Sequence, residues 1–499
     1  MLTLPPELLN AIVDELSARD KKNLRSTNKL FDLVVGPNLF STLVVDVKER
    51  GLFASVSCLK VFSEEGCEVT SYVKNLVIRS LGPTFDFPFV RGADGITWIT
   101  TPSSKEVDEK ALAFDNMKEL LPRVLSSFVN LASVEWTIPH YDPEWAHALV
   151  INTIATLPLL SNLSLEFVWN YHKPHASPLN LSPFHNLKSF SLKGSFRDLE
   201  ENVLRPIRGL LKNNADLSTL SLDFTKSSSS TEADLDQFIT SWSPKVLAKA
   251  NLKHLRLGLF QGTLTPSSLS HLRSLSSLEL LDARMVVSAN IWDALHQEKI
   301  HLREIVVPAV NDSFLRYIGS YSGIRKLHYH SVGAPIERAD STLADMFYEQ
   351  VLPRHTDTLE DLAIHPRFEG RWSFGERNAK VLRQCTVLMS LGVSLDRVHG
   401  GSLNVASALN CALSHPHLQQ LYLRCTLFVG PRPTKRKPTV LSSALIFSLT
   451  KDIEQAVLSF TTQAESNRML EVVAHDSNYE KIYETRVEHG VLGFVAVDA

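Results

Sequence analysis

The chain has few cysteines, little net charge and no long apolar run, and each of these shortages excludes a class of protein. Its 499 residues include 5 cysteines, an odd number with no CxxC pair, so neither a disulfide framework nor a structural zinc pattern is present. A net charge of −3 creates no global field that would attract nucleic acid or an acidic membrane. No stretch approaches the roughly 18 uninterrupted apolar residues of a membrane helix. We therefore expect a chain from a reducing compartment, cytoplasmic or nuclear, that binds neither nucleic acid nor membrane.

Motifs that carry chemistry are also missing. The sequence has no GxSxG elbow, no GxxxxGK[ST] phosphate loop, no HExxH helix and no GxGxxG turn. The start, MLTLPPELLN, lacks the basic residues and apolar core of a secretory signal, so we expect none. We expect no enzyme, no catalytic residue and no cofactor.

One group of residues resembles a set of metal ligands: Cys411, His415, His417 and Cys425. Their spacing does not match a zinc knuckle, and we interpret them as a buried thiol and loop histidines, with no metal bound. An enzyme that uses this group with zinc is a distant alternative.

A six-residue phrase, apolar at its first, fourth and sixth positions, recurs through most of the chain. LSNLSL at Leu160 is a clear copy, and less regular copies precede it at FSTLVV, YVKNLVI and LASVEW. From there the phrase begins at Leu160, Leu187, Leu217, Leu252, Leu275, Leu302, Ile324, Leu359, Leu388 and Leu418. This spacing, in the twenties and thirties, marks a stacked repeat, and LxxLxL is the core of the leucine-rich repeat.

The phrase has a physical explanation in the geometry of a strand. Alternate side chains of a strand point to opposite faces, so the fourth and sixth residues enter the stack together. One copy buries too few apolar residues to offset the entropy of ordering itself, so each needs its neighbours. Apolar-periodic stretches such as VLRPIRGLLKN, LADMFYEQVL and VASALNCAL precede many strands and predict covering helices. We expect an α/β leucine-rich-repeat solenoid, a horseshoe with parallel strands on its concave face.

The third, fifth and seventh positions should form that concave face. Their mixed polarity, with aromatic and arginine anchors, suits protein recognition, although solvated strand faces are the simpler explanation for any one residue. The predicted target-binding residues are His254, Arg256, Lys326, His328, His330, His365, Tyr422 and Arg424.

Residues 1–40 carry a helical pattern instead of the phrase. After Pro5 and Pro6, apolar residues spaced by four predict one helix, and Asp20 and Asn28 are placed to cap a second and a third. Gly36 and Pro37 should end the third.

This segment, LPPELLNAIVDEL followed by DKKNLRSTNKLFDLVV and PNLF, resembles the F-box in its fungal style. It departs from that motif at Lys21, Ser26 and Thr27, where apolar residues are usual. The resemblance implies docking to a Skp-type adaptor and, through it, to a cullin-RING ubiquitin ligase. The matching positions are Leu4, Pro5, Glu7, Leu8, Ile12, Leu16, Asp20, Leu24, Asn28, Phe31 and Leu33, and the implied adaptor contacts are Leu4, Pro5, Leu8, Ile12, Leu16, Leu24 and Phe31.

The predicted organisation is an F-box at 1–40, a solenoid at 41–430 with an inserted loop near 80–120, and a basic loop with a C-terminal cap at 431–499. The basic RPTKRKP, from Arg432 on, is either a solvated loop or a nuclear import signal. By resemblance, the chain would be the substrate-recognition subunit of an SCF-type E3 ubiquitin ligase, with an unknown protein target. A repeat scaffold with no ubiquitin role is the alternative.

Overall fold

The computed structural model describes most of the chain in two compact units. The described residues are 4–47, 52–64, 67–82, 90–91, 97–98, 104–139, 142–168, 179–196, 200–225, 233–240, 251–258, 260–261, 264–281, 290–331, 340–366, 369–396, 403–426, 443–463, 469–475 and 480–497. Unit 1 comprises residues 1–233 and 240–252, and unit 2 comprises 234–239 and 253–499. The basic segment RPTKRKP lies outside the described residues.

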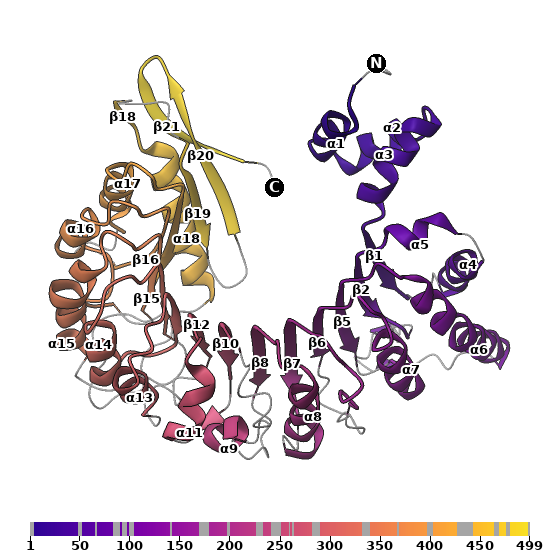
Figure 1. Cartoon of the computed structure of the whole chain (residues 1–499). Coiled ribbons are helices and arrows are strands. Elements are labelled where there is room, and N and C mark those ends of the chain that lie inside the picture. Colours follow the sequence, from indigo (N-terminus) through magenta and orange to yellow (C-terminus); the bar gives the residue numbers. More distant parts are fainter. Residues whose placement is uncertain are drawn as a thin grey trace. The chain divides into compact units, whose positions relative to one another are not determined.

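Unit 1 is a ladder of parallel strands preceded by three helices (Figure 1). Its strands pair in the order β1, β2, β5, β6, β7, β8. Their bounds are Thr42–Asp46, Asn75–Ser80, Ser133–Pro139, Asn162–Val168, Ser189–Ser195 and Thr219–Thr225, with a short pair β3 (Val90–Arg91) and β4 (Thr97–Trp98). The helices are α1 (Pro6–Asp14), α2 (Ala18–Arg25), α3 (Lys29–Leu39), α4 (Leu52–Ser63), α5 (Glu68–Tyr72), α6 (Ser104–Ser127), α7 (Glu144–Ile154) and α8 (Arg205–Asn213), the last entered through a π-helical turn, η2 (Glu200–Leu204).

Unit 2 continues the same design and ends in an antiparallel hairpin. Its parallel strands pair in the order β10, β12, β13, β14, β15, β16, β17, β19. Their bounds are His254–Leu257, Ser277–Leu280, Glu304–Val307, Lys326–His330, Asp361–His365, Ser390–Leu395, Gln420–Cys425 and Glu471–His475. Strand β20 (Glu480–Glu488) then pairs antiparallel with β19 and with β21 (Val491–Ala496), which also meets β18 (Thr462–Gln463).

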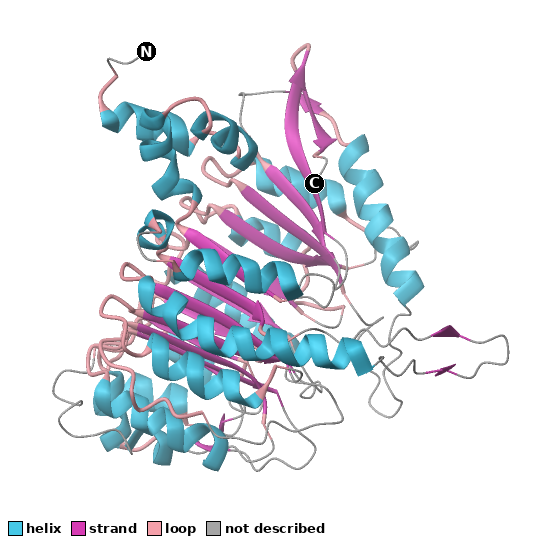
Figure 2. Ribbon diagram, turned by 90° about the vertical axis from the view of Figure 1, so that its right-hand side faces the viewer, coloured by secondary structure: helices cyan, strands magenta, loops and turns pink. Residues whose placement is uncertain are grey.

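As in unit 1 (Figure 2), helices cover one face of the unit 2 ladder (Figure 1). They are α9 (Leu235–Thr240), α11 (Pro266–Leu269), α13 (Ile291–Gln297), α14 (Asp312–Ile318), α15 (Asp340–Met346), α16 (Glu376–Leu382), α17 (Val405–Leu413) and α18 (Ser443–Ser459). Short 3₁₀ turns, η3 (Ser270–Leu272) and η5 (Leu352–Arg354), and one π-helical turn, η4 (Phe347–Val351), adjoin them. Unit 2 also contains a two-residue strand, β11 (Phe260–Gln261). No helix in the described part of the chain has the length and hydropathy of a bilayer-crossing segment.

The repeated phrase forms the core, as predicted. In the copy at Leu217, the residues at positions one, four and six are 5%, 0% and 0% exposed, and the copy at Leu418 gives 1%, 0% and 0%. Fourth-position residues also pair directly in register, for example Leu391 with Leu421. The α/β ladder of parallel strands is therefore the arrangement expected of a leucine-rich-repeat-like solenoid.

The N-terminal helices form where expected, but two of their predicted boundaries are wrong. Ser17, and not Asp20, caps α2: its hydroxyl accepts the backbone N–H of Asp20 at 3.2 Å and donates to that carboxylate at 2.7 Å. Ser17 is therefore the N-cap, and the acidic residue at the third helical position accepts a hydrogen bond from its hydroxyl. Asn28 caps α3 as predicted, but α3 runs through Gly36 and Pro37 to Leu39. Pro37 lies in the last turn and lacks the N–H that would bond to the Leu33 carbonyl, so the helix loses one hydrogen bond there and ends two residues later.

A second difference concerns the stretch where we expected an inserted loop near 80–120. Helix α6 begins at Ser104 and fills the later part of that stretch, and its buried Ala113, Met117 and Leu121 recur at steps of four. The earlier part lies mostly outside the described residues. Apolar spacing at 113, 117 and 121 could have indicated this helix.

Candidate protein-interaction surfaces

Helix α1 carries two apolar rows, and only one of them is used in folding. Leu9 and Val13, at 7% and 2% exposure, are buried, and α1 packs on α3. Leu8 and Ile12, one position earlier in each case, are 52% and 49% exposed. Residues four apart lie on one helix face, so Leu8 and Ile12 form a continuous exposed apolar row. We call Leu8 and Ile12 the α1 row.

The seven predicted adaptor contacts divide into two groups. Leu4, Pro5 and the α1 row are exposed, whereas Leu16, Leu24 and Phe31 are half-buried among the three helices. Sequence analysis did not place Leu33 of α3 among these contacts, although it is 62% exposed. The match of Leu33 to the F-box motif was the only feature of the sequence that indicated an adaptor contact at this position.

The ladder of each unit has one face that its helices do not cover, which we call the open face. In unit 1 the third-position row of this face is uncharged and carries small polar side chains. Its third-position residues pair across the strands as a row of hydroxyl and amide groups: Thr42, Asn75, Ser133, Asn162, Ser189 and Thr219. Charge appears in the next rows, where Lys193 meets Glu166 at 2.7 Å.

The open face of unit 2 is different because charged and aromatic side chains dominate it. Its third-position row consists of His254, Ser277, Glu304, Lys326, Asp361, Ser390, Gln420 and Glu471. Ion pairs cross between strands: Arg256 lies 3.4 Å from Glu279, and Lys326 lies 3.7 Å from Asp361. His254 Nδ1 lies 4.0 Å from a carboxylate oxygen of Glu304. All eight predicted target-binding residues belong to this face.

The structure brings three of those eight residues together. The rings of His330 and His365 stack with centroids 5.1 Å apart, and His328 meets His330 edge-on at 5.4 Å. We call these three residues the histidine cluster. His254 and Arg256 lie apart from it, on β10. Tyr422, whose hydroxyl donates to Gln420 at 3.1 Å, and Arg424 lie on β17, two strands from β15.

Small residues make room for the cluster. A Cβ added to Gly392 on β16 would lie 2.8 Å from His365 Nε2 and 3.1 Å from the Cβ of Ala363. His365 therefore leans across Gly392, and its Nδ1 lies 3.4 Å from the Ser394 hydroxyl. His365 itself is buried although it is on the open face.

Charge around the cluster is unevenly distributed. His328 Nε2 lies 2.9 Å from an oxygen of Asp361. Burial acts to raise the pKa of Asp361, but His328, Lys326 and Ser390 lower it below its ordinary value. Burial lowers the pKa of His330 to about 4, helped by the positive charges of His328, Arg424 and Lys326 and opposed by Asp361. His330 is therefore neutral at pH 7.

The cysteine and histidine group does not converge. His415 is buried and its Nδ1 lies 3.2 Å from the Cys385 carbonyl, His417 is exposed, and Cys425 packs against Leu449. Within the described residues, no three His, Cys, Asp or Glu side chains are placed to hold a metal ion. All five cysteines are free thiols.

A buried carboxylate that sequence analysis missed lies in unit 1. One oxygen of Asp142 accepts the backbone N–H groups of Leu81 and Gly82, each at 2.8 Å, and lies 3.3 Å from the Ser80 hydroxyl. Burial raises the pKa of Asp142 to about 6, although these hydrogen bonds act to lower it. Asp142 therefore fixes the chain where it leaves β2.

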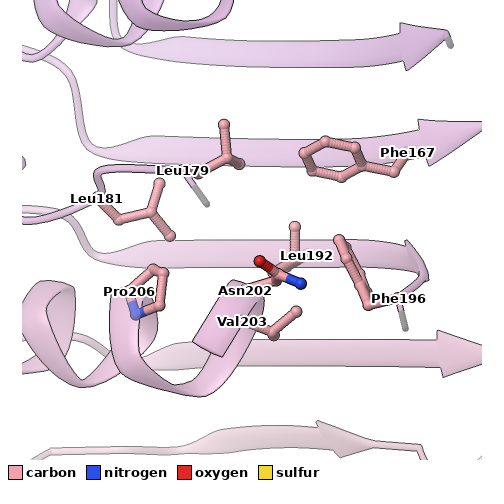
Figure 3. A pocket seen from close by; sticks show the side chains of 8 residues that line it. All are labelled: Phe167, Leu179, Leu181, Leu192, Phe196, Asn202, Val203 and Pro206. Carbon is pink, nitrogen blue, oxygen red and sulfur yellow. The ribbon is translucent and has the colours of Figure 1, made fainter. Parts of the chain in front are cut away.

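A small apolar cavity lies beside β7, between the strand and the π-helical turn before α8 (Figure 3). Its volume is about 10 Å³, which is close to the least that a single water needs. It is a packing gap and too small for a ligand. The lining residues are Phe167, Leu179, Leu181, Leu192, Phe196, Asn202, Val203 and Pro206.

Comparison with known proteins gives fold neighbours only. No protein-family model matches the chain, and no curated protein does. Among solved structures, the chain is similar to one in the crystal structure of the Rad7 and Elc1 complex in yeast, with 12% identity and a TM-score of 0.42 over 88% of this chain and 92% of that one. It is also similar to a chain of the TLR13–ssRNA13 complex, with 12% identity and a TM-score of 0.32 over 73% of this chain and 42% of that one. Neither likeness bears on function.

Proposed function

We propose that this protein is the substrate-recognition subunit of an SCF-type E3 ubiquitin ligase. Its N-terminal helices would act as an F-box that docks a Skp-type adaptor, and its repeats would hold a target protein. The observation that carries the proposal is the α1 row, because Leu8 and Ile12 are about half exposed on a helix whose other apolar row, Leu9 and Val13, is already buried. The resemblance of residues 1–40 to the F-box supplies the identity of the partner.

The energetics suit a docking face. Burying a leucine or isoleucine side chain completely contributes about 1.5–3 kcal/mol, so covering the half-exposed α1 row would contribute roughly 2 kcal/mol in total. Leu4 and Leu33, which are 39% and 62% exposed, extend the apolar area available to the same partner. Leu16, Leu24 and Phe31 would mainly hold the three helices together.

The protein itself would perform no bond chemistry under this proposal. By holding a target in one complex with the charged ubiquitin carrier, it would raise the effective concentration of the target's lysines. The open face of unit 2 is the better candidate for the target, since it carries the charged and aromatic groups that interfaces favour.

The test is co-purification with a recombinant Skp-type adaptor. Ile12→Asp places a charge in the α1 row and should abolish co-purification, while circular dichroism shows unchanged secondary structure. Leu159→Asp, at a residue that is 54% exposed elsewhere in unit 1, is the matched control and should bind as the unaltered chain does. Equal adaptor binding by both variants would contradict the proposal.

The second candidate, a repeat scaffold with no ubiquitin role, is favoured by a specific contact. Helix α3 packs on α5, where a Cβ on Gly36 would lie 3.2 Å from the ring of Tyr72. Such packing also suits a cap that seals the first repeat. In that case the full-length chain would capture no adaptor or cullin from its native cell extract. Under the ligase proposal both are captured, and both are lost when residues 1–40 are removed.

A further inference from the structure

We propose that two copies of this chain associate through the free edge of β1 and the adjoining helix α4. The inference goes beyond the proposed function and does not depend on it. It names one surface, the end of the unit 1 ladder at which the repeats begin, and one partner, a second copy of the same chain related to the first by a two-fold axis.

The first observation is the edge of β1. Within the described residues, β1 pairs with β2 on one side only. The Ser41 carbonyl accepts the backbone N–H of Asn75 at 2.9 Å, so the odd-numbered residues of this strand direct their backbone groups toward β2. Backbone groups alternate along a strand, and those of Thr42 and Val44 therefore point to the free edge. Such an edge is a template on which another strand can pair.

The core layer behind β1 is also incompletely covered. The two core-facing residues of β1, Leu43 and Val45, are only half-buried, whereas their partners on β2, Leu76 and Ile78, are each 1% exposed. A repeat is buried by its neighbours on both sides, and β1 has a strand on one side. In unit 2 the last parallel strand, β19, is covered by the antiparallel strand β20. No strand covers β1 in this way in the described part of unit 1.

Helix α4 presents an apolar surface at the same end. It is the last of the helices α8, α7, α6 and α4 that follow the unit 1 ladder, and it packs on α6 (Figure 1). Four exposed residues share its outer side: Phe53, Ala54, Ser57 and Val61. We call them the α4 arc. Phe53 is 56% and Val61 is 55% exposed, and Lys60 is the only charged residue of the helix. A solvated helix normally has a polar outer face, so the α4 arc suits a contact with another apolar surface.

Self-complementarity identifies a second copy as the partner. Two β1 strands that pair antiparallel about Val44 place this residue opposite its own copy, on the two-fold axis. Leu43 then lies opposite Val45, so the core-facing apolar residues meet. Thr42 lies opposite Asp46, so no like charges meet across the pair. An axis normal to the sheet keeps the helices of both copies on one face, which brings the two uncharged α4 arcs together.

The size of this surface predicts a weak dimer. A strand edge and one helix arc would bury on the order of 1,000 Å² in total, at the lower end of stable interfaces, so we expect association at micromolar concentrations. Because the paired strands run in opposite directions, the helices α1 to α3 of the two copies lie at opposite ends of the pair. The α1 row takes no part in this contact.

The experiment is sedimentation velocity of the full chain under reducing conditions, from about 1 to 100 µM. The unaltered chain should change from monomer to dimer as its concentration rises. Val44→Glu and Val44→Lys should each weaken association by at least about tenfold, because like charges then meet on the axis. An equimolar mixture of these two variants should restore the dimer, since unlike charges then meet.

Two matched controls accompany these variants. Val168→Glu changes a valine on the open face of β6 that is 44% exposed, compared with 47% for Val44, and should dimerise as the unaltered chain does. Phe53→Gln in the α4 arc should weaken association by about fivefold, a loss typical of an aromatic residue in an interface. Leu159→Gln, at a residue that is 54% exposed elsewhere in unit 1, should not.

Three results would overturn the assignment. A chain that stays monomeric up to about 100 µM would leave the edge of β1 to a different protein. Dimerisation of Val44→Glu as tight as that of the unaltered chain would locate the contact elsewhere, and equal weakening by Val168→Glu would show a non-specific effect of charge. Restoration of the dimer in the mixture shows that both Val44 variants are folded. None of these measurements involves the adaptor, so their outcome and that of the Ile12→Asp co-purification are independent.

Discussion

Asp142 provides a test of the unit 1 structure in which the effect of one substitution on stability depends on pH. Its carboxylate is 6% exposed and has a pKa of about 6, compared with an ordinary value of 3.8. A raised acid pKa means that the folded state binds the proton more tightly than the unfolded state. Above pH 6 both states are ionised and the folded state is disfavoured by about 3 kcal/mol, at about 1.36 kcal/mol per pKa unit. Below pH 4 this penalty is absent.

We therefore expect Asp142→Asn to stabilise the chain segment at Leu81 and Gly82 at pH 8 and to leave it nearly unchanged at pH 4. The asparagine oxygen can still accept both N–H groups, which lie 2.8 Å from the aspartate oxygen. Asp142→Ala should instead destabilise the segment at both pH values by about 1–3 kcal/mol, because it leaves buried N–H groups without an acceptor.

The measurement is hydrogen exchange of the peptide that covers residues 76–82, with each variant compared to the unaltered chain at the same pH. His147, which contacts the Trp136 ring at 5.8 Å and whose pKa is lowered by burial, gives a stability change of opposite sign as pH rises. It is present in all variants, so it cancels in the difference. A stability difference between Asp142→Asn and the unaltered chain that stays constant from pH 4 to pH 8 would refute the reasoning.

Two further predictions concern packing and thiol chemistry. Gly392→Ala should destabilise unit 2 by about 1–3 kcal/mol in urea denaturation, because its new Cβ would lie 2.8 Å from His365. The control is Gly209→Ala in α8, whose new Cβ would lie 3.5 Å from Ser182 and which should be stabilising by about 0.5–1 kcal/mol. Equal changes in stability for the two variants would show that His365 moves freely. Burial raises the pKa of Cys385 to about 12 and that of Cys411 to about 11, so a thiol reagent at pH 8 should label exposed Cys58 and spare both until denaturation. Mass spectrometry of labelled peptides checks this, and rapid labelling of Cys411 in the native chain would contradict it.

The strands could be predicted from sequence because burial of the phrase is periodic and local. Every copy from Leu160 onward places its fourth residue on a strand or at its start, since that residue must enter the core wherever the strand lies. Helix boundaries were harder to predict. Ser17 and Asp20 can each cap a helix, and only the backbone path decides between them.

The candidate site could be predicted only in part. Alternation alone places Lys326, His328 and His330 on the open face. That His365 would lean across Gly392 depends on side-chain contacts between neighbouring strands, which periodicity does not contain. Asp142 escaped prediction for a similar reason, because its partners at Ser80, Leu81 and Gly82 are about sixty residues away in sequence. The pairing of β20 with β19 likewise depends on tertiary packing, and the sequence of β20 showed no phrase.

The antiparallel hairpin at the end of unit 2 affects how such a chain can grow. Strand β20 reverses direction against β19, and the turn to β21 uses His489 and Gly490, both with positive φ. A parallel strand added after β21 would find no matching layer of leucines, and β20 offers Glu484, Arg486 and Glu488 among its side chains. The hairpin therefore ends the parallel ladder of unit 2 at β19, because β20 runs against β19 in the opposite direction.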